Sequence, residues 1–299
     1  MTDLLRRIRE MTEDVGLDRG RPILVAVRVP ASVPFCEAAG LDVKRWLEDG
    51  LVDLLVPGEL ELSPWEEMVT LGHSHNVSVY PCLSWTGSKK RKGPPEVQSD
   101  LPRRSFRARA MNIWHAGADG VYSFNLPDGL DPANSIWREL GDPQTLASLD
   151  KDYFPHGYWR ALLGNDFRDM RRFVKAPLPP FPEGPVTLEL GQPHEVTVTI
   201  GEDLTGEGHP PVKVTLSLNT TSPVNANALA VTLNDHPLTD PIVKDSWVSF
   251  VVASQWLHDG DNAIRITNQD QTGNAIILRD VHVGIANSSV SVRPTGARR

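Results

Sequence analysis

Two glutamates stand where a predicted strand ends. Glu59 and Glu61 lie on the loop that follows the apolar run 52–56. Hydrolysis of a glycosidic bond needs two carboxyl groups roughly 5 to 9.5 Å apart, one to donate a proton and one to act as nucleophile or base. The two glutamates are candidates for this catalytic pair. Because both lie on one loop, a solvated loop without catalytic function is the alternative interpretation.

Other polar and aromatic residues follow predicted strands at the same edge. The carboxyl ends of parallel strands meet at one edge of a sheet, where α/β proteins bind their ligands. Aromatic rings pack against sugar C–H groups, and planar polar side chains pair with hydroxyls, so this set indicates carbohydrate binding. A packed loop anchor is the alternative for Trp85, and a solvated loop is the alternative for Asp128. The candidate substrate-binding residues are Arg28, Ser84, Trp85, Asn125 and Asp128.

Histidine and acidic residues elsewhere lack the spacing of metal ligands. His73 and His75 are two residues apart, so they do not converge as ligands at i and i+4 do. Asp119 follows a glycine and an alanine in a tight turn between helix and strand, which favours a hydrogen bond to the backbone. No phosphate-binding glycine pattern follows a strand. We therefore expect neither a metal nor a cofactor.

Helical and strand-like segments alternate in the first half of the chain. Short apolar strands without strict alternation, separated by helices, predict a parallel sheet that is covered by helices. The predicted strands are 23–27, 52–56, 77–83 and 120–124, and the predicted helices are 4–15, 41–47, 64–73, 103–115 and 135–149.

The pattern changes after the proline-rich stretch 176–182, which favours an extended linker. Strand-like runs with turn residues between them follow, at spacings typical of an antiparallel β-sandwich. We predict an α/β domain at 1–175, a linker at 176–184 and an all-β sandwich at 185–299. The predicted sandwich strands are 186–190, 195–200, 212–218, 228–233, 247–252, 263–267 and 276–285.

The composition is that of a globular protein with an acidic balance. The formal net charge of -8 argues against nucleic acid and anionic membranes as partners. Residues 1–20 are too charged for a signal peptide, and no apolar run reaches the roughly 18 residues of a membrane-spanning helix. We therefore expect a cytoplasmic location by default. Cys36 and Cys82 are too few for a disulfide framework.

Several strings of the first half resemble a known family. They are 28–30, 40–46, 50–57, 117–125 and 140–143. Together they resemble the bacterial glycosyl hydrolase-like family 10 proteins, whose barrels are (β/α)8. The resemblance covers roughly residues 20 to 155, and the all-β tail is similar to the jelly-roll accessory modules of carbohydrate enzymes.

The resemblance implies the carboxyl-terminal half of such a barrel, because only four strands are predicted where the family has eight. In barrel hydrolases with the common carboxylate arrangement, the acid/base comes from strand four, which has no counterpart here. Ser84 stands where a carboxylate often ends strand seven. The expected function is a carbohydrate-active protein, a glycoside hydrolase acting on a poly- or oligosaccharide. The alternative is a non-catalytic glycan-binding or scaffold protein with a degenerate barrel.

The predicted half barrel has a further consequence. A parallel sheet of four strands leaves two strand edges unpaired, which proteins rarely tolerate. We therefore expect something to complete it. The candidates are a second copy in a homodimer and a separate amino-terminal barrel half.

Overall fold

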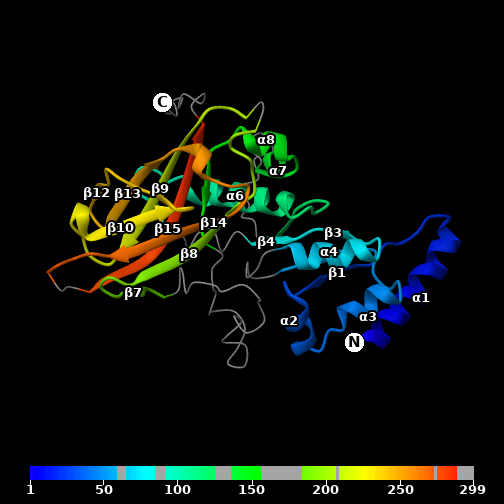
Figure 1. Ribbon diagram of the computed structural model, residues 1–299. Helices are drawn as coiled ribbons and strands as arrows, with labels where there is room; N and C mark the ends of the chain where they lie inside the picture. Colours follow the sequence, from blue (N-terminus) through cyan, green and yellow to red (C-terminus); the bar gives the residue numbers. More distant parts are fainter. Residues whose placement is uncertain are drawn as a thin grey trace, which may run out of the picture.

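The computed structural model describes residues 1–58, 65–84, 92–124, 136–155, 184–206, 209–272 and 275–287. Helices and a parallel sheet occupy the first part of the chain, and antiparallel sheets occupy the second part (Figure 1). The predicted combination of an α/β part with an all-β part is therefore observed. Among the described residues, the parallel strands do not close into a barrel.

The helices begin and end at residues with clear local causes. The Asp42 side chain accepts a hydrogen bond from the backbone N–H of Arg45 and caps α3, and Asp142 caps α8 in the same way. Gly20 adopts a left-handed conformation, with φ of 66°, and ends α1. The helices are α1 (Thr2–Arg19), α2 (Val33–Ala38), α3 (Val43–Glu48), α4 (Glu66–Ser74), α6 (Leu101–His115), α7 (Ile136–Leu140) and α8 (Pro143–Ala147).

The parallel strands follow one another in chain order. β1 (Ala26–Val29) pairs with β2 (Leu54–Pro57), and β2 pairs with β3 (Ser78–Val79). β4 (Cys82–Ser84) pairs with β5 (Tyr122–Phe124). The strand predicted at 77–83 is thus observed as two pieces, β3 and β4, separated by Tyr80 and Pro81. A proline has no N–H to donate to a ladder, which accounts for the break.

One face of the parallel sheet packs against the helices. Leu55, Val79 and Leu83 point to this side and share a core with side chains of α3, α4 and α6. The contact with α4 is close: a side chain at Gly72 would collide with Val79. This core positions the strands, and therefore their carboxyl ends.

The second part of the chain forms two antiparallel sheets around its own core. One sheet has the order β11-β10-β14-β8, and the other has the order β12-β13-β9-β15-β6, with β7 also paired to β15. Side chains from alternate positions of both sheets make up the core. The strands are β6 (Lys151–Tyr153), β7 (Val186–Leu188), β8 (Pro193–Ile200), β9 (Val212–Thr220), β10 (Leu229–Leu233), β11 (His236–Pro237), β12 (Ile242–Lys244), β13 (Trp247–Val252), β14 (Gly260–Asn268) and β15 (Ile276–Asn287).

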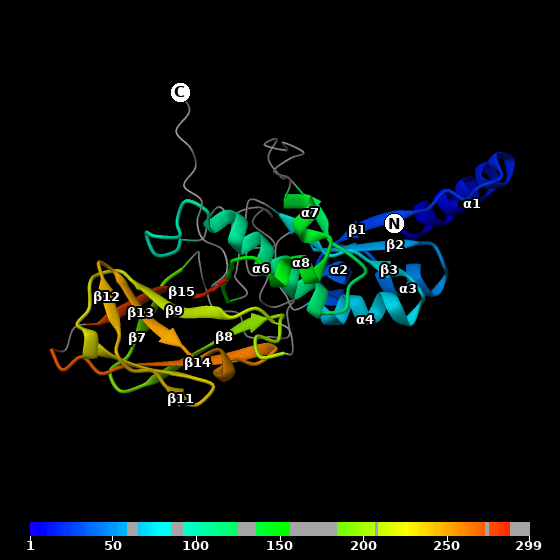
Figure 2. The same cartoon turned by 90° about the horizontal axis from the view of Figure 1, so that it is seen from above.

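The helix α6 and the strand β6 join the two parts. α6 lies between the parallel sheet and the antiparallel sheets (Figure 2). Phe106 and Ile113 of α6 belong to the core of the α/β part, whereas Ala108 belongs to the other core. β6 was not predicted as a strand, and it pairs with β15 in an antiparallel sheet. Residues 151–153 of the predicted α/β domain therefore lie in a sheet of the all-β part.

Some predicted elements differ from those observed. The helix predicted at 135–149 is two short helices, α7 and α8, because Asp142 starts a new helix. α2, β11 and β12 were not predicted. All but the last residue of the predicted linker, 176–184, lies outside the described residues.

Candidate functional site

Two of the predicted site residues lie in the described part of the chain. Arg28 is at the carboxyl end of β1 and is exposed, and Ser84 ends β4 and is buried. The other predicted site residues lie outside the described residues; they are Glu59, Glu61, Trp85, Asn125 and Asp128.

Arg28 meets an aromatic ring that the sequence analysis did not single out. The Arg28 guanidinium carbon lies 4.1 Å from the centroid of the Phe124 ring, a cation–π geometry. Arg28 comes from the first parallel strand and Phe124 ends the last, so the two outer strands of the sheet contribute to one place. A planar cation on an aromatic ring is a surface of the kind that binds sugars.

Ser84 is held through its backbone. Its carbonyl oxygen accepts a hydrogen bond of 3.1 Å from Nη1 of Arg109, which lies on α6. The Arg109 guanidinium also lies 5.4 Å from the centroid of the Phe106 ring. A helix arginine thus fixes the end of β4, and with it the point where the chain leaves towards Trp85.

Gly58 and Trp65, the described residues on either side of 59–64, lie against each other. Gly58 has φ of 96°, and a Cβ at this position would lie 2.7 Å from the Trp65 ring. The Gly58 N–H donates to the carbonyl of Val29, which ties this point to β1. The described residues on either side of Glu59 and Glu61 are therefore in contact at the carboxyl end of β2.

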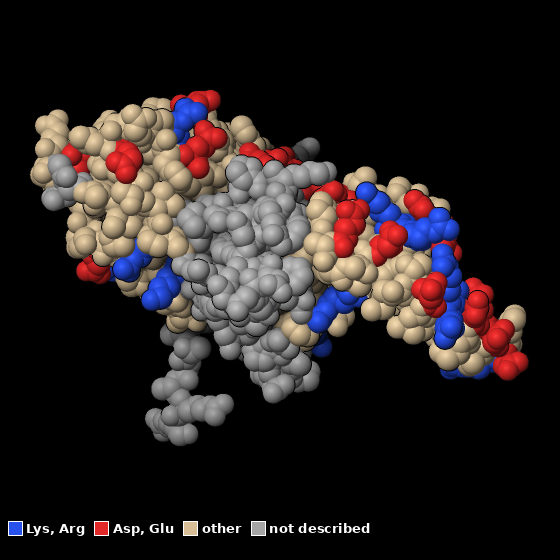
Figure 3. Space-filling view, turned by 90° about the horizontal axis from the view of Figure 1, so that it is seen from below, with Lys and Arg blue, Asp and Glu red and all other residues tan. Residues whose placement is uncertain are grey.

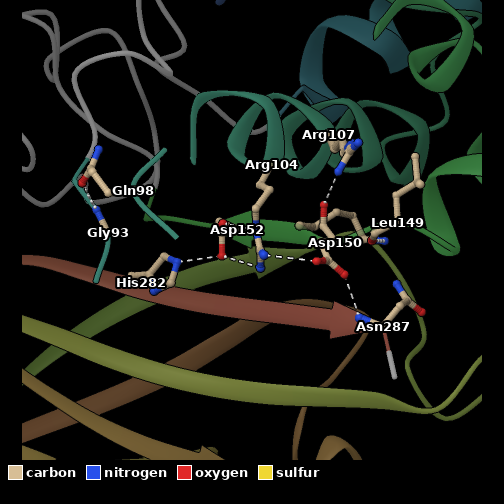
Figure 4. A network of polar contacts seen from close by, with 10 residues as sticks. Gly93, Gln98, Arg104, Arg107, Leu149, Asp150, Asp152, His282 and Asn287 are labelled. Carbon is tan, nitrogen blue, oxygen red and sulfur yellow. Dashed lines mark hydrogen bonds and ion pairs between the residues drawn. The ribbon is translucent and has the colours of Figure 1, made fainter. Parts of the chain in front are cut away.

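A network of buried ionic groups lies elsewhere, between α6 and β6 (Figure 4). Arg104 donates to both oxygens of Asp152, with Nε 2.5 Å from Oδ2, and to Oδ2 of Asp150 at 3.2 Å. His282 Nε2 lies 2.8 Å from Oδ1 of Asp152. The Asp150 Oδ1 accepts from the backbone N–H of Asn287 at 2.8 Å. Because arginine and histidine occupy the oxygens of Asp152, the network is a brace and offers no carboxyl group to a substrate.

A second arginine cluster flanks this brace. Arg107 and Arg103 both donate to the carboxylate of Glu139 on α7, and Arg107 also donates to the backbone carbonyl of Asp150. Burial opposes the ionisation of Glu139, but the hydrogen bonds from Arg107 and Arg103 outweigh it and lower its pKa. Glu139 therefore stays ionised and does not act as a proton donor.

Glu202 is the centre of a third buried cluster. Its oxygens accept from the Tyr153 hydroxyl at 2.6 Å and lie 3.1 Å from Lys151 Nζ and 3.5 Å from His209 Nε2. Burial lowers the pKa of Lys151 and raises that of Tyr153. The hydrogen bond to Glu202 raises the pKa of His209. Lys151 also donates to the carbonyls of Leu146 and Leu149, so the cluster ties the end of α8 to β6.

The structural role predicted for Asp119 is confirmed. Its Oδ2 accepts a 2.7 Å hydrogen bond from the backbone N–H of Val79 and lies 2.9 Å from Nε2 of His73. Burial opposes ionisation, and these hydrogen bonds lower the pKa of Asp119 below its ordinary value. Asp119 thus joins the turn before β5 to β3.

Acidic and basic side chains are interspersed at the α1 end of the face shown in Figure 3. Within the described ranges, no group of three or more histidine, cysteine or acidic side chains is placed to hold a metal ion. In the same ranges, every helix is too short or too polar to span a membrane.

Comparisons with known proteins find similarity to solved structures over part of this chain. No protein-family model and no curated protein matches the sequence. A β-porphyranase of glycoside hydrolase family 86 from the human gut bacterium Bacteroides plebeius is similar over 48% of this chain, with 16% sequence identity and a TM-score of 0.31. Two structures titled BuGH86, each in complex with neoagarooctaose, are similar over 46% of this chain, with 10% identity and a TM-score of 0.30.

This chain spans about a fifth of the length of those solved chains, namely 21% of the first and 18% of the other two. All three belong by title to family 86, and none to the family 10 that the sequence strings resemble.

Proposed function

We propose that this chain is a carbohydrate-active protein of the glycoside hydrolase type. It binds a poly- or oligosaccharide at the carboxyl edge of the parallel sheet. We also propose, from the sequence segments that resemble them, a relationship to the glycosyl hydrolase-like family 10 proteins.

The contact between Arg28 and Phe124 carries the proposal. Arg28 is exposed, and its guanidinium lies over the Phe124 ring, so the two side chains together present a planar cation and an aromatic ring at this edge. The chain continues from β2, β4 and β5 at this same edge into the segments that hold Glu59, Glu61 and Trp85. A planar cation, an aromatic ring and carboxylates are groups that can recognise sugars.

Hydrolysis is the finer form of the proposal, with Glu59 and Glu61 as the catalytic carboxylates. Bond cleavage requires one of them to protonate the leaving oxygen and the other to act as nucleophile or base. The alternative is a glycan-binding protein without turnover, in which the same glutamates only bind or face solvent.

Binding to a panel of neutral and sulfated oligosaccharides, with neoagarooctaose among them, tests the coarser proposal. We expect at least one ligand to bind, and Arg28→Ala to weaken its binding about tenfold or more, because a charged hydrogen bond is lost. Arg265→Ala removes a half-exposed arginine of the sandwich and is the matched control, which should leave affinity unchanged. A panel without a binder, or equal losses in both variants, would contradict the proposal.

Turnover of the bound glycan distinguishes a hydrolase from a glycan-binding protein without catalysis. If the chain hydrolyses its ligand, Glu59→Gln and Glu61→Gln should abolish product release and leave binding in place. Binding without any product supports the non-catalytic alternative. Unchanged turnover in both variants refutes their catalytic role.

A further inference from the structure

A hollow lies on the outer face of the sandwich sheet that contains β12, β13 and β9. Its floor is made mostly by side chains of these strands that alternate with those of the sandwich core and therefore point away from it. Its wall is the segment 94–96, which precedes α6. The volume is about 140 Å³, which has room for several waters or for part of a small ligand.

The wall of the hollow is held in shape by its own hydrogen bonds. The backbone N–H of Val97 donates to the carbonyl of Pro94 at 3.0 Å, and the N–H of Gly93 donates to Oε1 of Gln98 at 3.0 Å. The two prolines at 94 and 95 fix the backbone φ and carry no N–H that needs a partner. The wall is therefore preformed, which lowers the cost of ordering it around a ligand.

The floor offers hydrogen-bonding groups that the protein itself does not use. In the described part of the chain, the indole N–H of Trp247 and the hydroxyl of Thr215 have no hydrogen-bond partner, although Trp247 is only 7% exposed. The Ser249 hydroxyl has one partner, the hydroxyl of Ser217 at 2.8 Å. An indole N–H in so buried a residue ordinarily finds an acceptor. These groups are therefore available to a ligand that carries hydroxyls.

Apolar side chains flank these polar groups. The described part of the sandwich has three exposed large apolar side chains, and two of them line the hollow: Ile242, which is 60% exposed, and Val251, which is 61% exposed. Together with the Trp247 ring they give an apolar surface beside hydroxyl and N–H groups. Such a mixture packs against the C–H groups of a sugar ring and pairs with its hydroxyls.

The hollow also collects positive charge from a sandwich in which acidic residues outnumber basic ones. Of the four basic side chains in its described part, Lys213 and Lys244 line the hollow, and Arg265 and Arg279 do not. Lys213 has no ion pair within the described ranges. Lys244 lies 3.9 Å from Glu96, and both side chains are more than 60% exposed, so this pair is weak and a ligand anion can replace it.

The two lysines stand at opposite ends of the hollow. Lys244 on β12 is opposite Trp247 on β13, which is opposite Asn219 on β9, and Lys213 lies six residues before Asn219. At about 3.4 Å per residue, the two lysine positions are about 20 Å apart along the strands. A single small anion would use one lysine, whereas an extended ligand with repeated negative groups reaches both.

We propose that this hollow binds an acidic oligosaccharide, with sugar rings over the floor and acidic groups at Lys213 and Lys244. The acidic group is a carboxylate or a sulfate ester, which a lysine binds as a point charge. An extended peptide would instead pair with a strand edge, and the hollow lies on a sheet face. The inference rests on the proposed function for its class of ligand, but it uses neither Arg28 nor the two glutamates of the parallel sheet.

Titration calorimetry of the full chain with hexasaccharides of galacturonate, carrageenan and neoagarose tests the hollow. These probes carry carboxylates, sulfate esters and no charge, so the binder identifies the acidic group. We expect an acidic probe to bind, and the double variant Lys213→Ala/Lys244→Ala to weaken it about tenfold or more. Arg265→Ala/Arg279→Ala removes the same charge from the sandwich outside the hollow and should leave the affinity nearly unchanged. Thr215→Val, which loses only the hydroxyl, should weaken binding about fivefold.

Three results would overturn the inference: no acidic probe binds, both double variants lose the same affinity, or hexaglutamate binds as well as the acidic sugar. The last two would show attraction by charge alone. Arg28→Ala keeps this test apart from that of the proposed function. Acidic binding that survives Arg28→Ala and is lost in the lysine variant supports the hollow, even if no ligand depends on Arg28. Neutral binding that requires Arg28, without any acidic binding, overturns the hollow alone.

Discussion

Arg104 and Asp152 form a buried ion pair between a helix and a strand that lie 48 residues apart in the sequence, with Nε 2.5 Å from Oδ2. Arg104 belongs to α6, which packs on the parallel sheet, and Asp152 belongs to β6, which pairs with β15. This pair of side chains thus helps to connect the two cores of the molecule.

The first prediction concerns this pair. Asp152→Asn should lower the free energy of unfolding by about 3–5 kcal/mol, because the buried Arg104 loses the nearer and more buried of its two carboxylate partners. Chemical denaturation measures the change. Glu195→Gln removes one partner of the half-exposed pair with Arg265 and should cost at most about 1 kcal/mol. Equal losses in both variants would contradict the bracing role of Asp152.

The second prediction concerns pH. The hydrogen bond to Glu202 raises the pKa of His209 above its unfolded value of about 6.5. The added stability is therefore fully present below pH 6.5 and is lost as the pH rises through the raised pKa. His209→Gln should lower the free energy of unfolding more at about pH 5.5 than at about pH 8.5. His258→Gln, at an exposed histidine, is the control, and the same pH dependence in both variants would contradict the assignment.

The third prediction concerns the turn at Gly58. Gly58→Ala should cost about 2–4 kcal/mol, because a left-handed residue gains a Cβ that meets the Trp65 ring. Gly50→Ala has the same sign of φ but open space around its Cβ, so it should cost only about 1 kcal/mol. Thermal unfolding compares the two. If both variants lose the same stability, the Trp65 ring does not constrain the turn.

The fourth prediction concerns the thiols. Cys36 and Cys82 are buried, and burial raises the pKa of Cys36 to about 12. The native protein should therefore resist a thiol reagent, and the protein unfolded in guanidinium should react at both cysteines. Ala26→Cys places a thiol at an exposed position and is the positive control. Rapid labelling of the native wild type would contradict the burial of the thiols.

Much of the fold could be predicted from apolar patterns. The predicted strands of the second half are all observed, because residues such as Val196, Val198 and Ile200 alternate with polar ones along each strand. The parallel strands were predictable from short apolar runs, although Pro81 divides one of them.

The strand β6 could not be predicted in the same way. Lys151-Asp152-Tyr153 carries two charged residues, and their partners Arg104, His282 and Glu202 come from distant segments. Its pairing with residues 283–285 leaves no trace in the local sequence. Long-range ionic contacts of this kind depend on tertiary packing, which local patterns do not contain.

The sequence predicted where the candidate site lies, but not the side-chain contacts within it. The chain order of the strands identified their carboxyl edge, and Arg28 lies there. Phe124 was part of an apolar run, so its role under the guanidinium was not visible before its contact with Arg28 was known. Arg109 was hidden within a helix that also holds Arg103, Arg104 and Arg107.

Helix α6 has a consequence for how the protein unfolds. Its two sides are buried in different cores, and Asn112 accepts from the N–H of Gly201 and donates to the carbonyl of Thr199. A fragment cut at the proline-rich stretch would strip β6 from the edge of β15 and leave Asn112 without its partners Thr199 and Gly201. Neither half should be stable alone. We therefore expect one cooperative heat-absorption peak in calorimetry, with the sandwich and the parallel sheet melting together.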